Sequence, residues 1–241
     1  MVIINHEKCI GCGICLSYCP RGAIKLDPKT SKAYVLDNEC TECGSCLRVV
    51  ICPRDAIEPF IKNEAKAVSA YFSDPFTVHK ATGRKGRGTE EMKTNDVTGR
   101  FRRGEVGFAI DIGRPVPGVT IGEICRFVDT LNEINVKFED NNPIVQLVND
   151  IKKGYLSEEI KNEIIHSVVL EFKVPLAGVK EVIDKLKYLA STTDTVFSVG
   201  VISRIEENLE IPVIRVLRDL GLTVKPWAKV NVGLGRPLFI D

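Results

Sequence analysis

Two stretches near the N-terminus decide the fold: CIGCGICLSYCP at residues 9–20 and CTECGSCLRVVICP at residues 40–53. Their cysteines follow the spacings C-x2-C-x2-C-x3-C-P and C-x2-C-x2-C-x5-C-P. Three thiolates at two-residue intervals can surround one face of an iron–sulfur cube, and a fourth cysteine before proline closes a second cube. The spacing therefore predicts two [4Fe–4S] clusters and a protein that transfers single electrons.

The two cysteine runs belong to a wider internal repeat. CPRGAI at residues 19–24 is echoed by CPRDAI at residues 52–57. Between the two halves, residues 24–26 and 33–36 flank Asp27-Pro28-Lys29-Thr30. This pattern predicts a turn between two short strands.

With these motifs, residues 5–58 closely resemble the bacterial-type two-cluster ferredoxins, in which the fourth cysteine of each run ligates the other cluster. The resemblance implies that cluster 1 is held by Cys9, Cys12, Cys15 and Cys52, and cluster 2 by Cys19, Cys40, Cys43 and Cys46. The departure from the family pattern is the five-residue spacing between Cys46 and Cys52. We expect it to lengthen the helix between these ligands and to alter the surroundings of the Cys52-bound cluster.

Zinc is the alternative occupant of a cysteine-rich segment. Structural zinc usually takes cysteines in separated pairs, with four ligands at each site. Two triplets that are each followed by Cys-Pro fit that pattern poorly. The spacing therefore favours clusters over zinc.

Composition narrows the class of protein. The chain has 241 residues, 44% of them hydrophobic and 27% charged, which suits a soluble protein of one or two domains. A net charge of +1 predicts no general attraction to nucleic acid or to acidic membranes. No apolar run approaches the roughly 20 residues of a membrane span. The cysteine pattern and the N-terminal sequence favour reduced thiolates in the cytoplasm, and exposed clusters suit an anaerobic cell.

Charge near the cysteines bears on the kind of partner. Residues 1–60 contain seven basic and seven acidic side chains. Free ferredoxins often carry an acidic docking surface, and this segment has none. We therefore expect a built-in or permanent redox partner instead of a diffusing one.

Residues 83–104 form a glycine-rich basic segment. Its basic residues are Arg84, Lys85, Arg87, Lys93, Arg100, Arg102 and Arg103. Glycines allow close approach to a ligand and arginines bind carboxylate or phosphate, so the segment is either an anion-binding or partner-docking loop or a flexible connector. It lacks both common nucleotide-binding signatures. Around 89–96 it is faintly similar to ferredoxin-containing reductases of the 6-hydroxynicotinate reductase type.

Helix and strand patterns alternate after residue 104. Strands are predicted at 106–112, 136–138, 164–174, 195–202 and 223–232, and helices at 143–151, 179–189 and 212–220. A further helix is predicted from Thr120, where Thr120-Ile121-Gly122-Glu123 has the pattern of a capping box. The motif Pro-x-x-Gly-Val occurs at 115–119 and at 175–179, each time between a strand and a helix. Two such halves predict a βαββαβ unit, a ferredoxin-like α/β sandwich. The pattern is similar to ACT-type regulatory domains, which implies a small ligand at the turn; the alternative is a domain that only packs or dimerises.

Few other residues in the C-terminal part suggest chemistry. Cys125 lies on the apolar side of its predicted helix and is expected in the core. His79 and His166 have no ligand-like pairing, whereas Asp111 and Arg114 flank the first Pro-x-x-Gly turn, either as ligand contacts or as ordinary edge residues.

The sequence thus predicts an α+β protein in three parts: a 2[4Fe–4S] ferredoxin domain at 1–60, a linker at 61–104 and an α/β sandwich at 105–241. We expect an electron carrier or redox-complex subunit in which the sandwich docks a partner or binds a ligand. One alternative is a subunit or domain of a ferredoxin-containing reductase that binds an anionic substrate. The other is a redox regulator that responds to a ligand.

Overall fold

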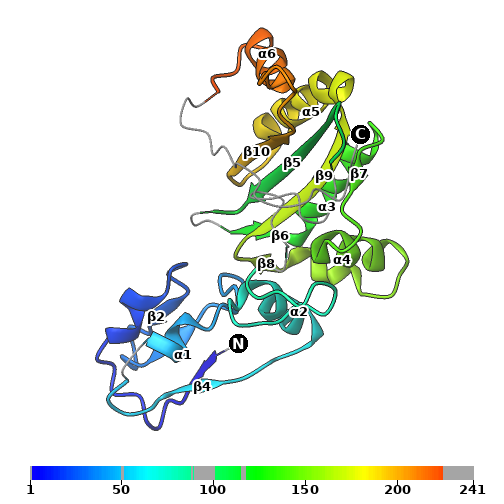
Figure 1. Ribbon diagram of the computed structural model, residues 1–241. Coiled ribbons are helices and arrows are strands. Elements are labelled where there is room, and N and C mark those ends of the chain that lie inside the picture. The colour runs from blue at the N-terminus through cyan, green and yellow to red at the C-terminus, as the bar shows by residue number, and fades with distance from the viewer. Residues whose placement is uncertain (1, 50–51, 88, 90–100, 115–117, 225–241) are drawn as a thin grey trace.

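The computed structural model describes residues 2–49, 52–87, 89, 101–114 and 118–224. Two bodies lie end to end, the N-terminal one at the bottom of Figure 1. Both contain helices and strands, as the predicted α+β class requires. No helix in the described part of the chain is both long and apolar enough to cross a membrane.

The N-terminal body is built from two small antiparallel sheets. Strand β1 (Val2–Ile4) pairs with β4 (Ile57–Pro59), and β2 (Ile24–Leu26) pairs with β3 (Ala33–Val35). The β2–β3 hairpin confirms the predicted turn, because Ser31 N donates to Asp27 O across it. Two short helices follow the first cysteines of each run: η1 (Ile14–Tyr18), a 3-10 helix, and α1 (Ser45–Val49).

The described part of α1 is as short as η1, with five residues each, so the expected lengthening is not seen there. The two helices differ in type instead, since α1 is α-helical. Residues 50 and 51 lie outside the described residues.

The hydrophobic core of the N-terminal body is small. Its buried members are Ile4, Cys9, Ile24, Ala33 and Ala56. Four further cysteines pack against this core while partly exposed. The cysteines therefore occupy the place that large apolar side chains fill in most domains.

Helix α2 (Glu64–Ser73) lies where the two bodies meet (Figure 1). The Asn63 side chain accepts a hydrogen bond from Lys66 N and so caps the first turn of α2. The apolar residues of this stretch would fit either a strand or a helix, and the cap favours the helix. Val68 and Phe72 pack into the core of the C-terminal body. The predicted linker thus contains a helix that belongs by its packing to the C-terminal body.

The C-terminal body contains a four-stranded antiparallel sheet. Its strands are β5 (Glu105–Ile112), β7 (Lys137–Phe138), β9 (Val168–Pro175) and β10 (Phe197–Ser203), in the order β10-β5-β9-β7. Phe108 lies opposite Phe172, with ring centroids 5.3 Å apart, and Ile110 lies opposite Leu170. All four are buried, which places the centre of the core on β5 and β9.

Helices complete this body. They are α3 (Ile121–Asn132), α4 (Pro143–Lys152), α5 (Val179–Thr192) and α6 (Pro212–Asp219), with the short turns η2 (Glu158–Asn162) and η3 (Leu176–Gly178). Apolar side chains of α3, α4 and α5 share one core with the sheet, and Cys125 is buried there as expected. Asn142 caps α4 and also donates to Val169 O at 2.8 Å, which fixes α4 against β9.

One predicted element is corrected by the structure. The strand expected at 164–174 is two strands, β8 (Ile164–Ile165) and β9, because β8 pairs with β6 (Val119–Thr120) and not within the main sheet. The predicted strand at 223–232 lies mostly outside the described residues, as do residues 115–117 of the first Pro-x-x-Gly motif.

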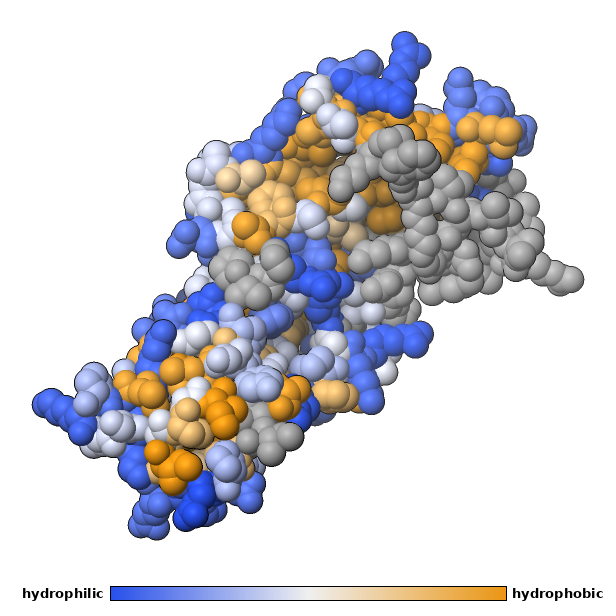
Figure 2. Space-filling view, turned by 90° about the vertical axis from the view of Figure 1, so that its left-hand side faces the viewer, coloured by the Kyte–Doolittle hydropathy of each residue, from blue (hydrophilic) through white to orange (hydrophobic). Residues whose placement is uncertain are grey.

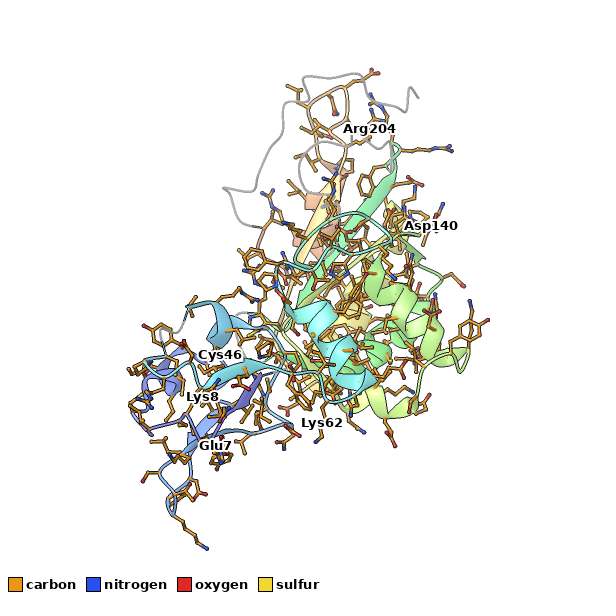
Figure 3. All side chains as sticks on the ribbon, turned by 90° about the horizontal axis from the view of Figure 1, so that it is seen from below. Glu7, Lys8, Cys46, Lys62, Asp140 and Arg204 are labelled. Carbon is orange, nitrogen blue, oxygen red and sulfur yellow. The ribbon has the colours of Figure 1, made fainter. Side chains whose placement is uncertain are left out.

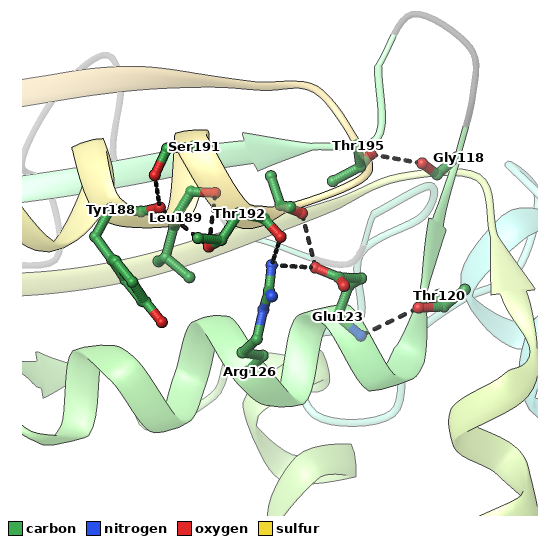
Figure 4. A network of polar contacts seen from close by, with 10 residues as sticks. Gly118, Thr120, Glu123, Arg126, Tyr188, Leu189, Ser191, Thr192 and Thr195 are labelled. Atoms are coloured by element: carbon green, nitrogen blue, oxygen red, sulfur yellow. Dashed lines mark hydrogen bonds and ion pairs between the residues drawn. The ribbon is translucent and has the colours of Figure 1, made fainter.

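The predicted capping box of α3 is half-formed (Figure 4). Thr120 Oγ1 accepts from Glu123 N at 3.1 Å, as predicted. The Glu123 carboxylate instead accepts from Arg126 at 2.8 Å and from Thr193 Oγ1 at 2.7 Å. Glu123 thus joins the start of α3 to the end of α5.

Candidate metal centres

The eight clustered cysteines line two separate cavities of the N-terminal body. One is lined by Cys19, Cys40, Cys43 and Cys46, and the other by Cys9, Cys12, Cys15 and Cys52. Within the described part of the chain, no three acidic, histidine or cysteine side chains converge as the ligands of a single metal ion would. Each set instead surrounds a cavity with four sulfurs, which is the donor set of a [4Fe–4S] cluster.

Backbone amides point at three of the sulfurs. Ala23 N lies 3.1 Å from Cys19 Sγ, and Ala56 N lies 3.3 Å from Cys52 Sγ at the equivalent place in the repeat. Ala33 N lies 3.4 Å from Cys9 Sγ. Such hydrogen bonds stabilise negative charge on sulfur and help to set the potential of a cluster.

Glycine permits the tight path of both loops. Gly11 has φ +71°, and a Cβ there would lie 2.1 Å from Ser31 O. Gly44 has φ +66°, and its Cβ would lie 2.6 Å from an Arg48 nitrogen. A side chain at Gly11 would push the loop away from the Ser31 backbone, whereas at Gly44 the Arg48 side chain can move and the positive φ is what requires glycine.

Burial disfavours the thiolate form at three of the clustered cysteines. Burial raises the pKa of Cys40 to about 12 and the pKa of Cys46 to about 11. Burial also raises the pKa of Cys15. Because a metal ligand must be a thiolate, binding of iron at these positions releases protons.

The two cavities differ in what surrounds them. Every residue that lines the Cys9 cavity belongs to the N-terminal body, and Cys12 there is exposed. The Cys19 cavity is larger and is also lined by Ala70 and by Asp74, which comes directly after α2. The Cys19 cavity therefore faces the C-terminal body. Figure 3 labels Cys46, one of its four cysteines, and Lys62, just before α2.

Charged groups border the Cys19 cavity. Arg48 pairs with Asp74 at 3.2 Å, and Arg21 pairs with Glu39 at 2.8 Å. Glu42 is buried, and this burial raises its pKa, against the effect of nearby positive charge that includes Lys66. The site thus combines buried thiols with charges of both signs.

The basic residues predicted to bind an anion do not gather at one place among those described. Arg87 pairs with Asp111 at 2.6 Å, and Arg114 lies 3.7 Å from the same carboxylate. Arg103 pairs with Glu206 at 3.1 Å near the other end of β5. Arg84 and Lys85 are exposed, and Arg102 N donates to Glu105 at 2.9 Å. Lys93 and Arg100 lie outside the described residues.

Sequence reasoning missed His79, which is fully buried. His79 Nε2 lies 2.9 Å from Gly86 O, and its backbone N donates to Arg84 O at 2.9 Å. The ring also packs edge-to-face against Tyr71, with centroids 4.5 Å apart. His79 therefore orders the start of the glycine-rich segment against α2. Its neighbours in sequence gave no signal of this, because its hydrogen-bond partners are backbone groups.

Exposed apolar residues occur on the N-terminal body, whose surface in Figure 2 mixes apolar and polar patches. Ile10 is 59% exposed and Ile14 is 44% exposed, on either side of Cys12. The approach to the Cys9 cavity is thus partly apolar.

Comparison with known proteins places residues 8–56 in the family described as the 4Fe-4S dicluster domain. The indolepyruvate oxidoreductase subunit IorA of Thermococcus kodakarensis is 45% identical over 61 residues, which are 25% of this chain and 9% of that protein. The pyruvate synthase subunit PorD of Thermotoga maritima is 43% identical over 56 residues, 23% of this chain and 54% of that subunit. No solved structure matches the chain significantly.

A third relative settles the family. An uncharacterized ferredoxin of Methanocaldococcus jannaschii is 41% identical over 58 residues, 23% of this chain and 73% of that ferredoxin. The predicted resemblance to two-cluster ferredoxins is therefore confirmed, and with it a cofactor content of two [4Fe–4S] clusters. The chain belongs to the ferredoxins that carry a 4Fe-4S dicluster domain, and residues 8–56 are its iron–sulfur electron-transfer domain.

Proposed function

We propose that Cys9, Cys12, Cys15 and Cys52 hold cluster 1, and that Cys19, Cys40, Cys43 and Cys46 hold cluster 2. The supporting observation is that each set lines a cavity of its own, although each combines cysteines from both runs. The hydrogen bonds from Ala23 N and Ala56 N reach the two Cys-Pro cysteines, which are the ligands exchanged between the runs.

The proposed function is electron transfer within an oxidoreductase complex, with this chain as a subunit. When bound, each cluster would accept one electron and then donate it. The chain keeps one cluster site facing solvent through the exposed Cys12 and turns the other toward α2. This asymmetry supports a route from an external redox partner through the Cys9 site to the Cys19 site and then to the C-terminal body.

The relatives of the dicluster domain support the proposal that this chain is a subunit of an enzyme complex. Those named above are subunits of an indolepyruvate oxidoreductase and of a pyruvate synthase. The chain spans 9% of the length of the first of them, so the likeness concerns the electron-transfer domain. All nine cysteines are free, which suits a reducing compartment such as the predicted cytoplasm.

We propose that the C-terminal body is the predicted ferredoxin-like α/β sandwich and that it docks the partner or binds a ligand. Its elements β5, α3, β7, β9, α5 and β10 follow the order of a βαββαβ unit. The strand order β10-β5-β9-β7 supports this, since the two β-α-β halves interleave. The division at 1–60, 61–104 and 105–241 stays a prediction, with α2 packing against the third part.

A reductase subunit that binds an anionic substrate is the second candidate. It is favoured by the loop that His79 orders, because Arg84 and Lys85 lie exposed on it. Oxidation of reduced clusters by an added small anion, with no partner protein present, would support this candidate. A ligand-responsive redox regulator is a further alternative, which predicts that a small metabolite raises the thermal stability of the chain.

Paired cysteine variants test the ligand sets. Anaerobically prepared wild-type protein should contain about eight irons per chain. A Cys19→Ala, Cys40→Ala double variant removes two ligands of one proposed cluster and should retain about four irons. A Cys52→Ala, Cys40→Ala variant removes one ligand of each cluster and should retain few or none. The opposite pattern would show that each run holds its own cluster and would overturn the assignment.

A further inference from the structure

Helix α2 places a row of buried polar side chains against the loop that carries Cys40 and Cys43. The row consists of Lys66, Ser69 and Ser73, which a helix presents along one side. The opposite side of α2 packs into the C-terminal core. A helix between two bodies would ordinarily place apolar residues on both sides, so the buried polar row requires an explanation.

Lys66 is the charged member of the row. Its side chain is 6% exposed, and Nζ lies 2.5 Å from Asp37 O and 2.8 Å from a carboxylate oxygen of Glu163. Asp37 precedes Cys40 by three residues, whereas Glu163 directly precedes β8 in the C-terminal body. The ammonium group therefore joins the loop of the Cys19 cavity to the C-terminal body.

The next turns of α2 repeat this connection. Ser69 Oγ donates to Ile164 O at 2.7 Å and lies 3.3 Å from Thr41 O, between Cys40 and Cys43. Ser73 Oγ accepts from His166 N at 3.0 Å. The polar row thus holds the cysteine loop on one side and the β8 segment on the other.

A buried charge is costly unless it is paired, and its influence on a neighbouring charge is strong because water does not screen it. Reduction adds one negative charge to a cluster. A buried ammonium group beside the cluster loop therefore favours the reduced form, and its carboxylate partner opposes that effect.

We propose that Lys66 is a positioning residue that also raises the reduction potential of the cluster in the Cys19 cavity. Glu163 is its counter-charge on the C-terminal body. The inference rests on the proposed function, since it requires a cluster in the cavity lined by Cys40 and Cys43.

The chain offers a matched control. Lys62 contacts the same aspartate, with Nζ 2.5 Å from Asp37 Oδ2, but its side chain is 53% exposed. Solvent screens an exposed pair, so its loss should have little effect. Lys62→Met and Lys66→Met remove the same charge from neighbouring positions and differ in burial.

The test is a redox titration of the anaerobically purified full chain, followed by electron paramagnetic resonance. We expect Lys66→Met to lower one of two midpoint potentials, Glu163→Gln to raise that same potential, and Lys62→Met to change neither. Opposite shifts in the first two variants are the signature of charge, because simple loss of packing would not reverse sign. Unchanged potentials in Lys66→Met with all iron retained would overturn the proposal.

The iron content of the variants distinguishes a positioning role of Lys66 at one cluster from a general loss of structure. Loss of about half of the iron in Lys66→Met, with recovery in Lys66→Arg, supports the positioning role at one cluster. Equal loss from both clusters contradicts it. In the Cys19→Ala, Cys40→Ala background, Lys66→Met should leave the surviving cluster unchanged. If the paired cysteine variants give the opposite iron pattern, the proposed ligand sets fail, whereas the shift from Lys66 can still be measured on the cluster that contains Cys40.

Discussion

Removal of both clusters should unfold the N-terminal body while the C-terminal body stays folded. The reason is the size of the N-terminal core, whose large buried aliphatic side chains among the described residues are Ile4 and Ile24, with the smaller Val2 also buried in that body. Its other buried members are alanines and Cys9. The clusters must therefore provide most of the interior of this body.

Magnitudes support that view. Full burial of a large aliphatic side chain contributes roughly 1.5–3 kcal/mol, so Ile4 and Ile24 together contribute about 3–6 kcal/mol. Ordering the backbone costs on the order of 1 kcal/mol per residue, or tens of kcal/mol for a body of this length. Backbone hydrogen bonds in strands of three residues cannot close such a gap, since each contributes about 1 kcal/mol net.

Hydrogen exchange measured by mass spectrometry can test this expectation on the full chain. Clusters are removed by oxidation in the presence of a chelator, and iron content is measured on the same sample. Amides of β2 and β3 should lose protection, whereas those of β5 and α3 should keep it and serve as the internal control. Persistent protection of the β2–β3 hairpin after complete loss of iron would refute the reasoning.

Three further predictions concern single residues. Gly11→Ala should lower iron content by displacing the loop from Ser31, whereas Gly83→Ala, also at positive φ but with open space around it, should cost only about 1–2 kcal/mol of stability and no iron. Phe127→Ala empties a fully buried position and should destabilise the C-terminal body by about 3–5 kcal/mol in thermal denaturation. Burial lowers the pKa of His79 below 6.5, so the folded state binds fewer protons there than the unfolded state. The stability of the protein should therefore fall as the pH drops below 6.5. His79→Gln should weaken this pH dependence in melting curves recorded from pH 7 to 5.

Sequence periodicity predicted the larger elements well. The helices α3 and α5 carry apolar residues at helical spacing: α3 begins one residue after the predicted Thr120 start, and α5 extends the helix predicted at 179–189 to Thr192. The resemblance to two-cluster ferredoxins implied two groups of four cysteines, and each group lines a cavity of its own; their assignment as cluster ligands stays a prediction. These features are local or repeat within a short stretch, so they can be read without tertiary contacts.

The features that sequence could not provide depend on distant partners. Strands β1 and β4 are three residues long and lie more than fifty residues apart, so neither shows a period. In α2, Lys66 and Ser69 are buried, although lysine and serine ordinarily indicate an exposed face. Their burial depends on hydrogen bonds to the carbonyl groups of Asp37 and Ile164, and a local sequence pattern cannot predict such distant partners.

Arg48 makes a second connection between the cysteine loop and the segment after α2. It lies between Cys46 and Cys52, donates to Cys43 O, pairs with Asp74 at 3.2 Å and lies 5.0 Å from the centre of the Phe76 ring. Its partners Asp74 and Phe76 come directly after α2. Arg48 thus provides a second attachment between the Cys40–Cys46 loop and the segment after α2, the helix that carries Lys66.

Both attachments act on the same cysteine loop, whereas the Cys9 cavity is lined by the N-terminal body alone. A diffusing ferredoxin would have no use for such one-sided attachment, because each cluster would meet its partner only transiently. A subunit that receives electrons at one site and delivers them at the other requires that the delivering site stay fixed to its acceptor. Under the proposed function, we expect the side that carries Lys66 and Arg48 to deliver electrons and partner proteins to approach the side that exposes Cys12.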